Sequence, residues 1–297
     1  MKSKGLIIFL IILLSIIAIT ITGFLIIALN SKFRFFNLPF NYKVMEELII
    51  DEVYENHYRN INIDADASDI EFIVSETNEV RVKIYGKKEN NRIEDNNDSL
   101  KIVSKEKVCK GLCFNINVKV SKVEVYLPEN YNGKINIVNK YGDINIANFK
   151  DAEINIDEDC GDVKIDKANI INVNNNYGDI DINEANSINI EEDCGDVKVG
   201  TVSDAVIKNS YGDIKISKVN NYLNIENDCG DIKIDTINLQ ESSYIQDNLG
   251  DIEIGKTNEI YIDASTDLGK VKVNNNYNKS DITLKIENDC GDIKVNN

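Results

Sequence analysis

The chain has 297 residues and a formal net charge of −17, with no Trp, two Pro and a single His. This length suits one long domain or two ordinary ones. The first 45 residues contain five basic and no acidic side chains, so the acid is concentrated in the remainder. Because a strongly acidic body repels phosphate backbones, nucleic acid is excluded as a predicted partner.

An uncharged stretch of 24 residues, Leu6 to Leu29, lies near the N-terminus. At about 1.5 Å per residue it is long enough to cross a hydrocarbon core of about 30 Å. A cleaved signal peptide is disfavoured, because the apolar run is too long and Ala28-Leu29-Asn30 is a poor cleavage site. We therefore expect a cytoplasmic stub at 1–5 and a transmembrane anchor at 6–29.

The predicted location is the cell membrane, as a single-pass protein with the bulk of the chain outside the cytoplasm. Basic residues flank both ends of the apolar stretch almost equally, so this orientation rests on the short N-terminal stub. Residues 30–55 form a predicted juxtamembrane segment, in which aromatic residues interleave with Lys32, Arg34 and Lys43. Such a composition suits the lipid interface.

Residues 56–130 form a predicted N-terminal β region. Apolar and polar residues alternate along several short runs, for example Asn60 to Ile63 and Glu79 to Tyr85, and such alternation is typical of half-buried strands. Pro128 ends the last run. A stack of repeats needs an atypical unit at its end, and we expect this region to cap the repeats that follow.

Residues 131–297 contain a repeated Gly-Asp dipeptide, followed in most copies by alternating Ile or Val. The fixed period predicts an all-β fold, a β-solenoid of stacked coils of about 17–20 residues. A coil of 34–35 residues, joining two repeats, is the alternative. Glycine is predicted to make each turn because it tolerates positive φ. The predicted structural glycines are Gly142, Gly161, Gly178, Gly195, Gly212, Gly230, Gly250 and Gly291.

The residue before glycine alternates between Tyr and Cys in the first six repeats, from Tyr141 to Cys229. Strand alternation predicts that both types project inward with the buried Ile residues, so that large and small side chains alternate in the core. In short coils Cys160 and Cys194 are two coils apart, beyond disulfide reach. Acidic residues before Cys and amide or basic residues before Tyr favour short coils, because acid then does not stack on acid.

The Asp after each glycine is a candidate calcium ligand, because stacked carboxylates repel one another and a bound cation would relieve this repulsion. A ladder of ion pairs would relieve it without a metal, since most repeats carry a Lys two residues after the Asp, on the same outward face. The glycine-rich calcium-binding nonapeptide is absent from the sequence. We favour the structural ladder and keep calcium as the alternative. The candidate ligands are Asp143, Asp162, Asp179, Asp196, Asp213 and Asp231.

The sequence predicts neither catalysis nor a cofactor. His57 is the single His, so the repeat cannot contain a Cys-His or Ser-His pair. A solenoid enzyme of the polysaccharide-lyase or hydrolase kind would need acid, base and Arg on one face, but the repeat has no Arg. Cys109 and Cys113 can be a local disulfide or two free thiols, and further zinc ligands are not evident near them.

The chain resembles the putative-adhesin, β-strand-repeat family of bacterial envelope proteins. The resemblance rests on Ile61-Asn-Ile63, on Val123 to Pro128, and on the Gly-Asp-Ile series that begins at Tyr141. It covers about residues 56–297 and implies a cell-surface or envelope-stress protein with a C-terminal β-solenoid. The resemblance carries no functional residues.

These patterns together predict a non-enzymatic, membrane-anchored envelope protein, an adhesin or an envelope-stress scaffold that acts through the surface of its solenoid. The expected partner is a cell-wall component, an envelope protein or a glycan. The alternative is a cation- or glycan-binding solenoid that uses acidic coils as ligands.

Overall fold

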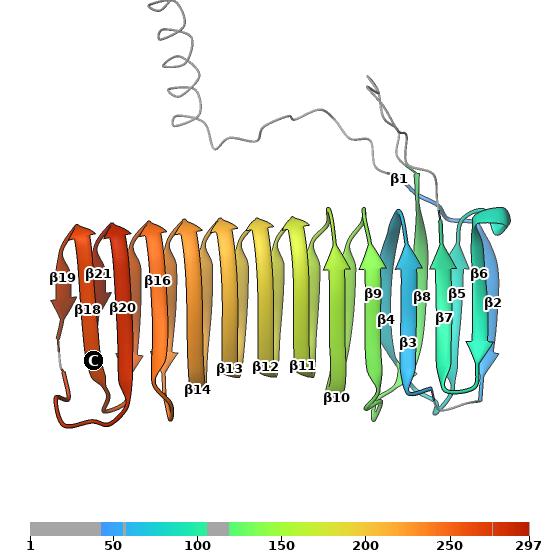
Figure 1. Ribbon diagram of the computed structural model, residues 1–297. Coiled ribbons are helices and arrows are strands. Elements are labelled where there is room, and N and C mark those ends of the chain that lie inside the picture. Colours follow the sequence, from blue (N-terminus) through green and yellow to red (C-terminus); the bar gives the residue numbers. More distant parts are fainter. Residues whose placement is uncertain (1–42, 56–57, 106–118, 275, 297) are drawn as a thin grey trace, which may run out of the picture. The chain divides into compact units, whose positions relative to one another are not determined.

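The computed structural model describes residues 43–55, 58–105, 119–274 and 276–296 (Figure 1). These residues form 21 strands and one short 3-10 helix, Lys88–Asn90, so the predicted all-β fold is confirmed. The predicted stub at 1–5, the anchor at 6–29 and the juxtamembrane segment up to residue 42 lie outside the described residues. Within the described ranges, no helix is long and apolar enough to span a membrane.

The middle of the repeat consists of five long strands, each of which passes through most of one coil. Neighbouring long strands pair in parallel, and Tyr177, Cys194 and Tyr211 occupy equivalent positions in consecutive coils. This register confirms the β-solenoid with short coils and shows that the coil of 34–35 residues is wrong. The five strands are β10 (Ile144–Glu158), β11 (Val163–Tyr177), β12 (Ile180–Cys194), β13 (Val197–Tyr211) and β14 (Ile214–Cys229).

Each coil has two faces that enclose a narrow apolar core. In β12, Ile180 and Ile182 point inward from the first face, and Ile188 and Ile190 point inward from the second, all at most 1% exposed. Ala185 is buried at the bend between the faces. Complete burial of one such side chain stabilises the fold by about 1.5–3 kcal/mol. The regular Ile/Val alternation of the sequence is thus the origin of the core.

The N-terminal region contributes two further coils to the same stack. On one face β3 pairs in parallel with β9 and β7, and on the other β4 pairs in parallel with β10 and β8. The strands of these coils are β3 (Asn60–Ala65), β4 (Ser68–Ser75), β7 (Ser99–Ser104) and β8 (Lys119–Pro128), and β9 (Lys134–Asn139) belongs to the adjoining coil of the repeat.

Antiparallel strands close this end of the stack. β6 pairs with β7, β5 pairs with β8, and β2 pairs with β5, all antiparallel, whereas β1 runs parallel to β8. Their bounds are β1 (Lys43–Val44), β2 (Leu48–Tyr54), β5 (Val80–Tyr85) and β6 (Asn91–Asn96). A change from parallel to antiparallel pairing ends the repeat of coils at this side.

The C-terminal coils do not stack in sequence order. The last coil in the chain, residues 283–295, lies between the coil of residues 243–257 and that of 261–273 (Figure 1). The strands involved are β15 (Ile232–Ile237), β16 (Ser243–Leu249), β17 (Ile252–Thr257), β18 (Tyr261–Leu268), β19 (Val271–Val273), β20 (Thr283–Cys290) and β21 (Ile293–Val295).

Composition explains this exchange of order. The last coil carries Ile286 and Ile293 inward, and both are almost fully buried between two neighbours. The coil of residues 261–273 contains the degraded Leu268-Gly-Lys turn, and it has Ala264 and Val271 where the last coil has Ile286 and Ile293. The coil with the complete apolar set thus occupies the inner position, and the weaker coil takes the outermost one.

Candidate functional site

One edge of the stack consists of the Gly-Asp turns. The backbones of neighbouring coils approach closely here, and a Cβ on Gly195 would lie 1.8 Å from the carbonyl oxygen of Gly178. Gly212 adds a second requirement, because its φ of +147° is a conformation that L side chains rarely adopt. Close stacking and turn conformation together explain why this position is glycine in every repeat.

The six candidate calcium ligands form one column beside these glycines, with a single Asp in each coil. Oδ1 of each accepts a hydrogen bond from the backbone N–H of the Asp in the next coil, for example from Asp179 to Asp162 at 2.9 Å and from Asp213 to Asp196 at 2.8 Å. The carboxylates therefore satisfy backbone donors at the turn. Within the described residues, no group of three or more His, Cys, Asp or Glu side chains could hold a metal ion. Calcium binding stays a prediction.

The predicted ladder of Asp–Lys ion pairs is largely replaced by these backbone hydrogen bonds. Lys215 does pair with Asp213, at 3.0 Å. Lys198 instead pairs with Asp181, at 3.0 Å, which occupies the equivalent position one coil away. The ion pairs are replaced because the turn brings a backbone N–H of the next coil within reach of each Asp. The side-chain pattern of the sequence does not reveal this donor.

A row of buried polar residues lies at the same edge, two positions before each Tyr and Cys of the repeat and before Leu249. The amides in it donate to turn carbonyls, since Nδ2 of Asn209 and Asn227 each lies 3.0 Å from the carbonyl oxygen of the glycine three residues later. The sequence interpretation missed this row, although a polar residue at an inward position in every repeat is its signal. The row comprises Asn139, Glu158, Asn175, Glu192, Asn209, Asn227, Asp247 and Asn288, each at most 4% exposed.

Burial changes the acid–base properties of the carboxyls in this row. Desolvation raises the pKa of Glu158 to about 8 and that of Glu192 to about 7. Oε2 of both residues lacks a hydrogen-bond partner within the described part of the chain, as does Oδ1 of the neighbouring Asn175. A protonated carboxyl supplies an O–H donor to a row whose unpaired atoms are oxygens, so the neutral form suits this position.

The Tyr and Cys residues do not point into the core, so the prediction of an inward Tyr/Cys row is wrong. Tyr177 is 59% and Tyr211 is 62% exposed, and Cys194 is partly exposed. The turn breaks the alternation, because Glu192 and Val197, five positions apart, both point inward. Alternation predicts that Glu192 and Cys194 both point inward, but the buried polar row is the last inward position before the turn.

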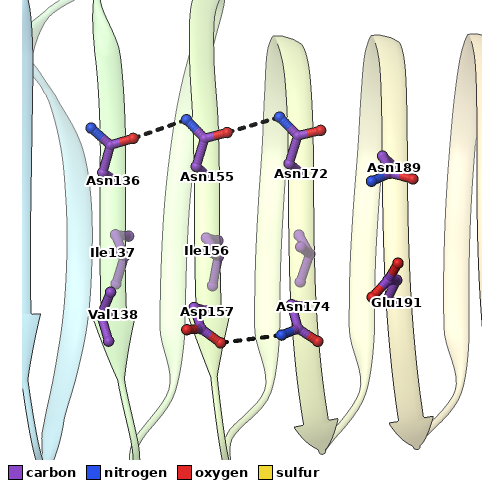
Figure 2. Close-up of a pocket in the computed structure, with 11 residues that line it drawn as sticks. Asn136, Ile137, Val138, Asn155, Ile156, Asp157, Asn172, Asn174, Asn189 and Glu191 are labelled. Atoms are coloured by element: carbon purple, nitrogen blue, oxygen red, sulfur yellow. Dashed lines mark hydrogen bonds between the residues drawn. The ribbon is translucent and has the colours of Figure 1, made fainter.

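A shallow groove of about 350 Å³ crosses several coils on the face before the glycine turns. Figure 2 shows that one side is a ladder of amides, in which Asn155 donates to Asn136 at 2.9 Å and Asn172 donates to Asn155 at 2.8 Å. On the other side Asn174 donates to Asp157, at 3.3 Å. Amides and carboxylates are groups that hydrogen-bond to hydroxyl-rich or amide-bearing ligands.

A second groove of about 380 Å³ is strongly acidic. Glu191, Asp193, Glu226 and Asp228 line it, and Lys208 pairs with Glu226 at 3.4 Å. Here the predicted interleaving of acidic coils with amide or basic coils is confirmed, since Lys208 lies between Glu191 and Glu226 in register.

Two sequence features lie outside the described residues. His57 falls in the gap at 56–57, and Cys109 and Cys113 fall in the gap at 106–118. Their roles therefore stay as predicted from sequence. The described Cys residues of the repeat, Cys160, Cys194, Cys229 and Cys290, are free thiols.

Comparison with known proteins places this architecture in a family. The profile described as Toastrack DUF4097 matches residues 58–187 and 171–297, in agreement with the resemblance found in the sequence. No curated protein matches the chain.

Two solved structures are similar to the chain at low identity. One, described as a "putative adhesin" from Bacteroides fragilis, is 17% identical, with 84% of this chain and 98% of that chain covered and a TM-score of 0.45. The other, a "putative lipid binding protein" from Parabacteroides distasonis, is 16% identical, with 86% and 100% covered and a TM-score of 0.48.

Proposed function

The chain belongs to the Toastrack DUF4097 family, and from this premise we propose that it is a non-enzymatic, membrane-anchored envelope protein that binds partners through the exterior of its solenoid. It serves as an adhesin or as an envelope-stress scaffold. The uncharged stretch at 6–29 is its anchor, and the acidic solenoid lies outside the cytoplasm.

One observation carries this proposal. The short-coil register places equivalent outward side chains in straight columns, such as Asn136, Asn155 and Asn172. A weak contact made by one coil is therefore offered several times along one line. Linked contacts of this kind raise overall binding strength far above that of a single contact.

A binding role for cations or glycans is the second candidate function, and the two grooves favour it. The amide-lined groove and the acidic groove both present hydrogen-bond acceptors in repeated rows. Hydroxyl-rich polymers and cations are the ligands that such rows can accept.

Membrane topology is tested on intact cells that express the full chain. An amine-reactive reagent that cannot cross membranes is expected to label Lys198 and Lys233 without lysis, and peptide mapping identifies the labelled residues. Lys2 and Lys4 serve as the internal control, because they are expected to react with the reagent only after the cells are lysed. Labelling of the repeat lysines that requires lysis would refute the outward orientation.

Partner binding is tested by cross-linking the full chain in its native membrane and identifying the linked envelope components. A substituted column, Asn136→Ala, Asn155→Ala and Asn172→Ala, is expected to reduce cross-linking if the amide face carries the contact. The matched control replaces outward side chains of the opposite face, Lys164→Ala and Lys198→Ala. An unchanged cross-linking pattern in both variants would exclude these two columns as the binding surface.

A further inference from the structure

The edge of the stack carries a continuous row of exposed side chains immediately before the glycines. Large residues occupy every second coil, and Cys occupies the coils between them. The large residues are 41–71% exposed. They are Tyr141, Tyr177, Tyr211, Leu249 and Leu268.

The exchanged order of the C-terminal coils preserves this alternation. In sequence, Leu249 is followed by Leu268 and then by Cys290. In space, Cys290 pairs with Leu249 on one side and with Leu268 on the other. Large residues and Cys therefore alternate without interruption from Tyr141 to Leu268. We call the five large residues the Tyr row.

Backbone hydrogen bonds fix the spacing of the Tyr row. Gly178 N–H donates to the carbonyl of Cys194 at 3.1 Å, and Gly195 N–H donates to that of Tyr211 at 3.0 Å. Parallel strands are about 4.8 Å apart, so consecutive tyrosines are separated by about 9.6 Å. Three rings at this interval, from Tyr141 to Tyr211, span about 19 Å.

Hydrogen-bonding groups border the Tyr row on both sides. The Asp column after the glycines lies on one side in sequence, and on the other lies a polar column in which Asn176 donates to Asp159 at 3.1 Å and Asn248 donates to Asp228 at 2.8 Å. Exposed rings are thus flanked by carboxylates and amides. The acidic borders disfavour a polyanion, and they also disfavour a second copy of this chain, whose own borders would meet them.

These features match the chemistry of one polymer class. A tyrosine ring packs against the C–H face of a pyranose, and carboxylates accept hydrogen bonds from sugar hydroxyls. An extended β-1,4-linked chain repeats its disaccharide over nearly the length of two coils. We propose that the tyrosines of the Tyr row bind an uncharged β-1,4-linked polysaccharide that lies along the stack, with one disaccharide for each of Tyr141, Tyr177 and Tyr211.

This inference deepens the proposed surface-binding function and rests on it. Its test uses full-length protein in mild detergent, with soluble chitin and cellulose oligosaccharides long enough to reach from Tyr141 to Tyr211. Calorimetry is expected to show binding of at least one of the two, and comparison of the two shows whether N-acetyl groups contribute. Tyr177→Ala with Tyr211→Ala is expected to weaken binding by about tenfold or more.

Four variants test whether binding depends on the rings of the Tyr row and on their spacing. Tyr277→Ala removes an exposed tyrosine that lies outside the row and is expected to leave the affinity unchanged. Tyr177→Trp keeps a stacking ring and is expected to preserve it. Tyr177→Ala alone is expected to weaken binding, and Tyr177→Ala with Cys194→Tyr, which keeps the number of rings but shifts one by a coil, is expected to bind equally weakly.

Several outcomes would overturn the inference. The first is that neither oligosaccharide binds. The second is that binding persists in Tyr177→Ala with Tyr211→Ala while circular dichroism shows an intact fold. The third is that Tyr177→Ala with Cys194→Tyr binds as tightly as the wild type. A dimer in size-exclusion chromatography that this double variant disperses would assign the row to a second copy instead. Outward labelling of the repeat lysines can succeed in each of these cases, so the proposed function is judged separately.

Discussion

At the scale of single residues, the repeat is shaped by the spacing between neighbouring backbones. Glycine is required where a coil passes its neighbour, and Asp is required because it accepts a backbone N–H from the next coil. Neither requirement is visible in one repeat by itself. The Gly-Asp dipeptide is therefore a solution to stacking, which is why it recurs in coil after coil.

Substitution of a turn glycine tests this explanation. Gly195→Ala places a Cβ 1.8 Å from the carbonyl oxygen of Gly178, and we expect it to lower the free energy of unfolding by about 3 kcal/mol. Gly269→Ala is the matched control. A Cβ on Gly269 would lie 2.0 Å from the carbonyl oxygen of Gly291. Gly269 belongs to the outermost coil, which can move outward, so we expect the free energy of unfolding to fall by only about 1 kcal/mol. Urea denaturation measures both, and equal losses would contradict the account.

The buried carboxyls predict a dependence of stability on pH. Burial raises the pKa of Glu158 to about 8 and that of Glu192 to about 7, from an ordinary value of 4.5. A raised pKa in the folded state means that the native protein holds the proton more tightly. The stabilisation is complete below the unfolded pKa and is lost as the pH rises through the folded values.

Replacement of both carboxyls by amides removes this dependence. We expect Glu158→Gln with Glu192→Gln to melt near the wild-type temperature at about pH 4 and roughly 5 °C higher at about pH 9. Thermal melts followed by circular dichroism provide the measurement. The control Asp157→Asn with Glu191→Asn changes exposed acids in the same coils, and a similar gain there would attribute the effect to surface charge.

At the scale of strands and coils, the exchanged order at the C-terminal end is the feature that most needs a direct test. Coil order is set by which pairs of coils bury the most apolar surface, and the coil of residues 283–295 has the better inward set. Sequence order alone places that coil at the end of the stack. The two arrangements differ in which residues lie beside Cys290.

Disulfide trapping distinguishes the two arrangements. Equivalent residues of neighbouring parallel strands lie about 4.8 Å apart, within the range that a disulfide spans. Because Cys229 also borders residue 249, the test uses a Cys229→Ser background. Leu249→Cys and Leu268→Cys are each expected to form a disulfide with Cys290 there under mild oxidation, as mass spectrometry of peptides will show. In sequence order, Leu249→Cys would not reach Cys290. Cys290→Ser in the same background removes the expected bond and serves as control.

At the scale of the whole chain, the net charge of −17 predicts a response to salt. Raising sodium chloride from about 0.01 M to about 1 M shortens the Debye length from about 30 Å to about 3 Å. We expect the melting temperature to rise, because repulsion between neighbouring acidic columns is screened. Calcium and magnesium chlorides at equal ionic strength are expected to act alike, since Oδ1 of each column Asp is already occupied. A larger rise with calcium would establish the calcium alternative.

The sequence predicted the solenoid and its short coil well, because both follow from period. Ile and Val at alternate positions specify the core, and acids interleaved with amides specify the register. The Tyr/Cys row was predicted on the wrong side, because alternation holds along a strand and fails at a turn, as between Glu192 and Val197. The exchanged order of the C-terminal coils could not be predicted from the sequence either, because it depends on which whole coil packs better against the coil of residues 243–257.

The position of the coil of residues 283–295 has a consequence for biosynthesis. The ribosome completes the coil of residues 261–273 first, yet the native structure places the later coil between it and the coil of residues 243–257. Growth of the stack therefore cannot follow translation to the end. The earlier coil has to wait undocked, or leave a position it has already taken, before the final hydrogen bonds of the sheet can form.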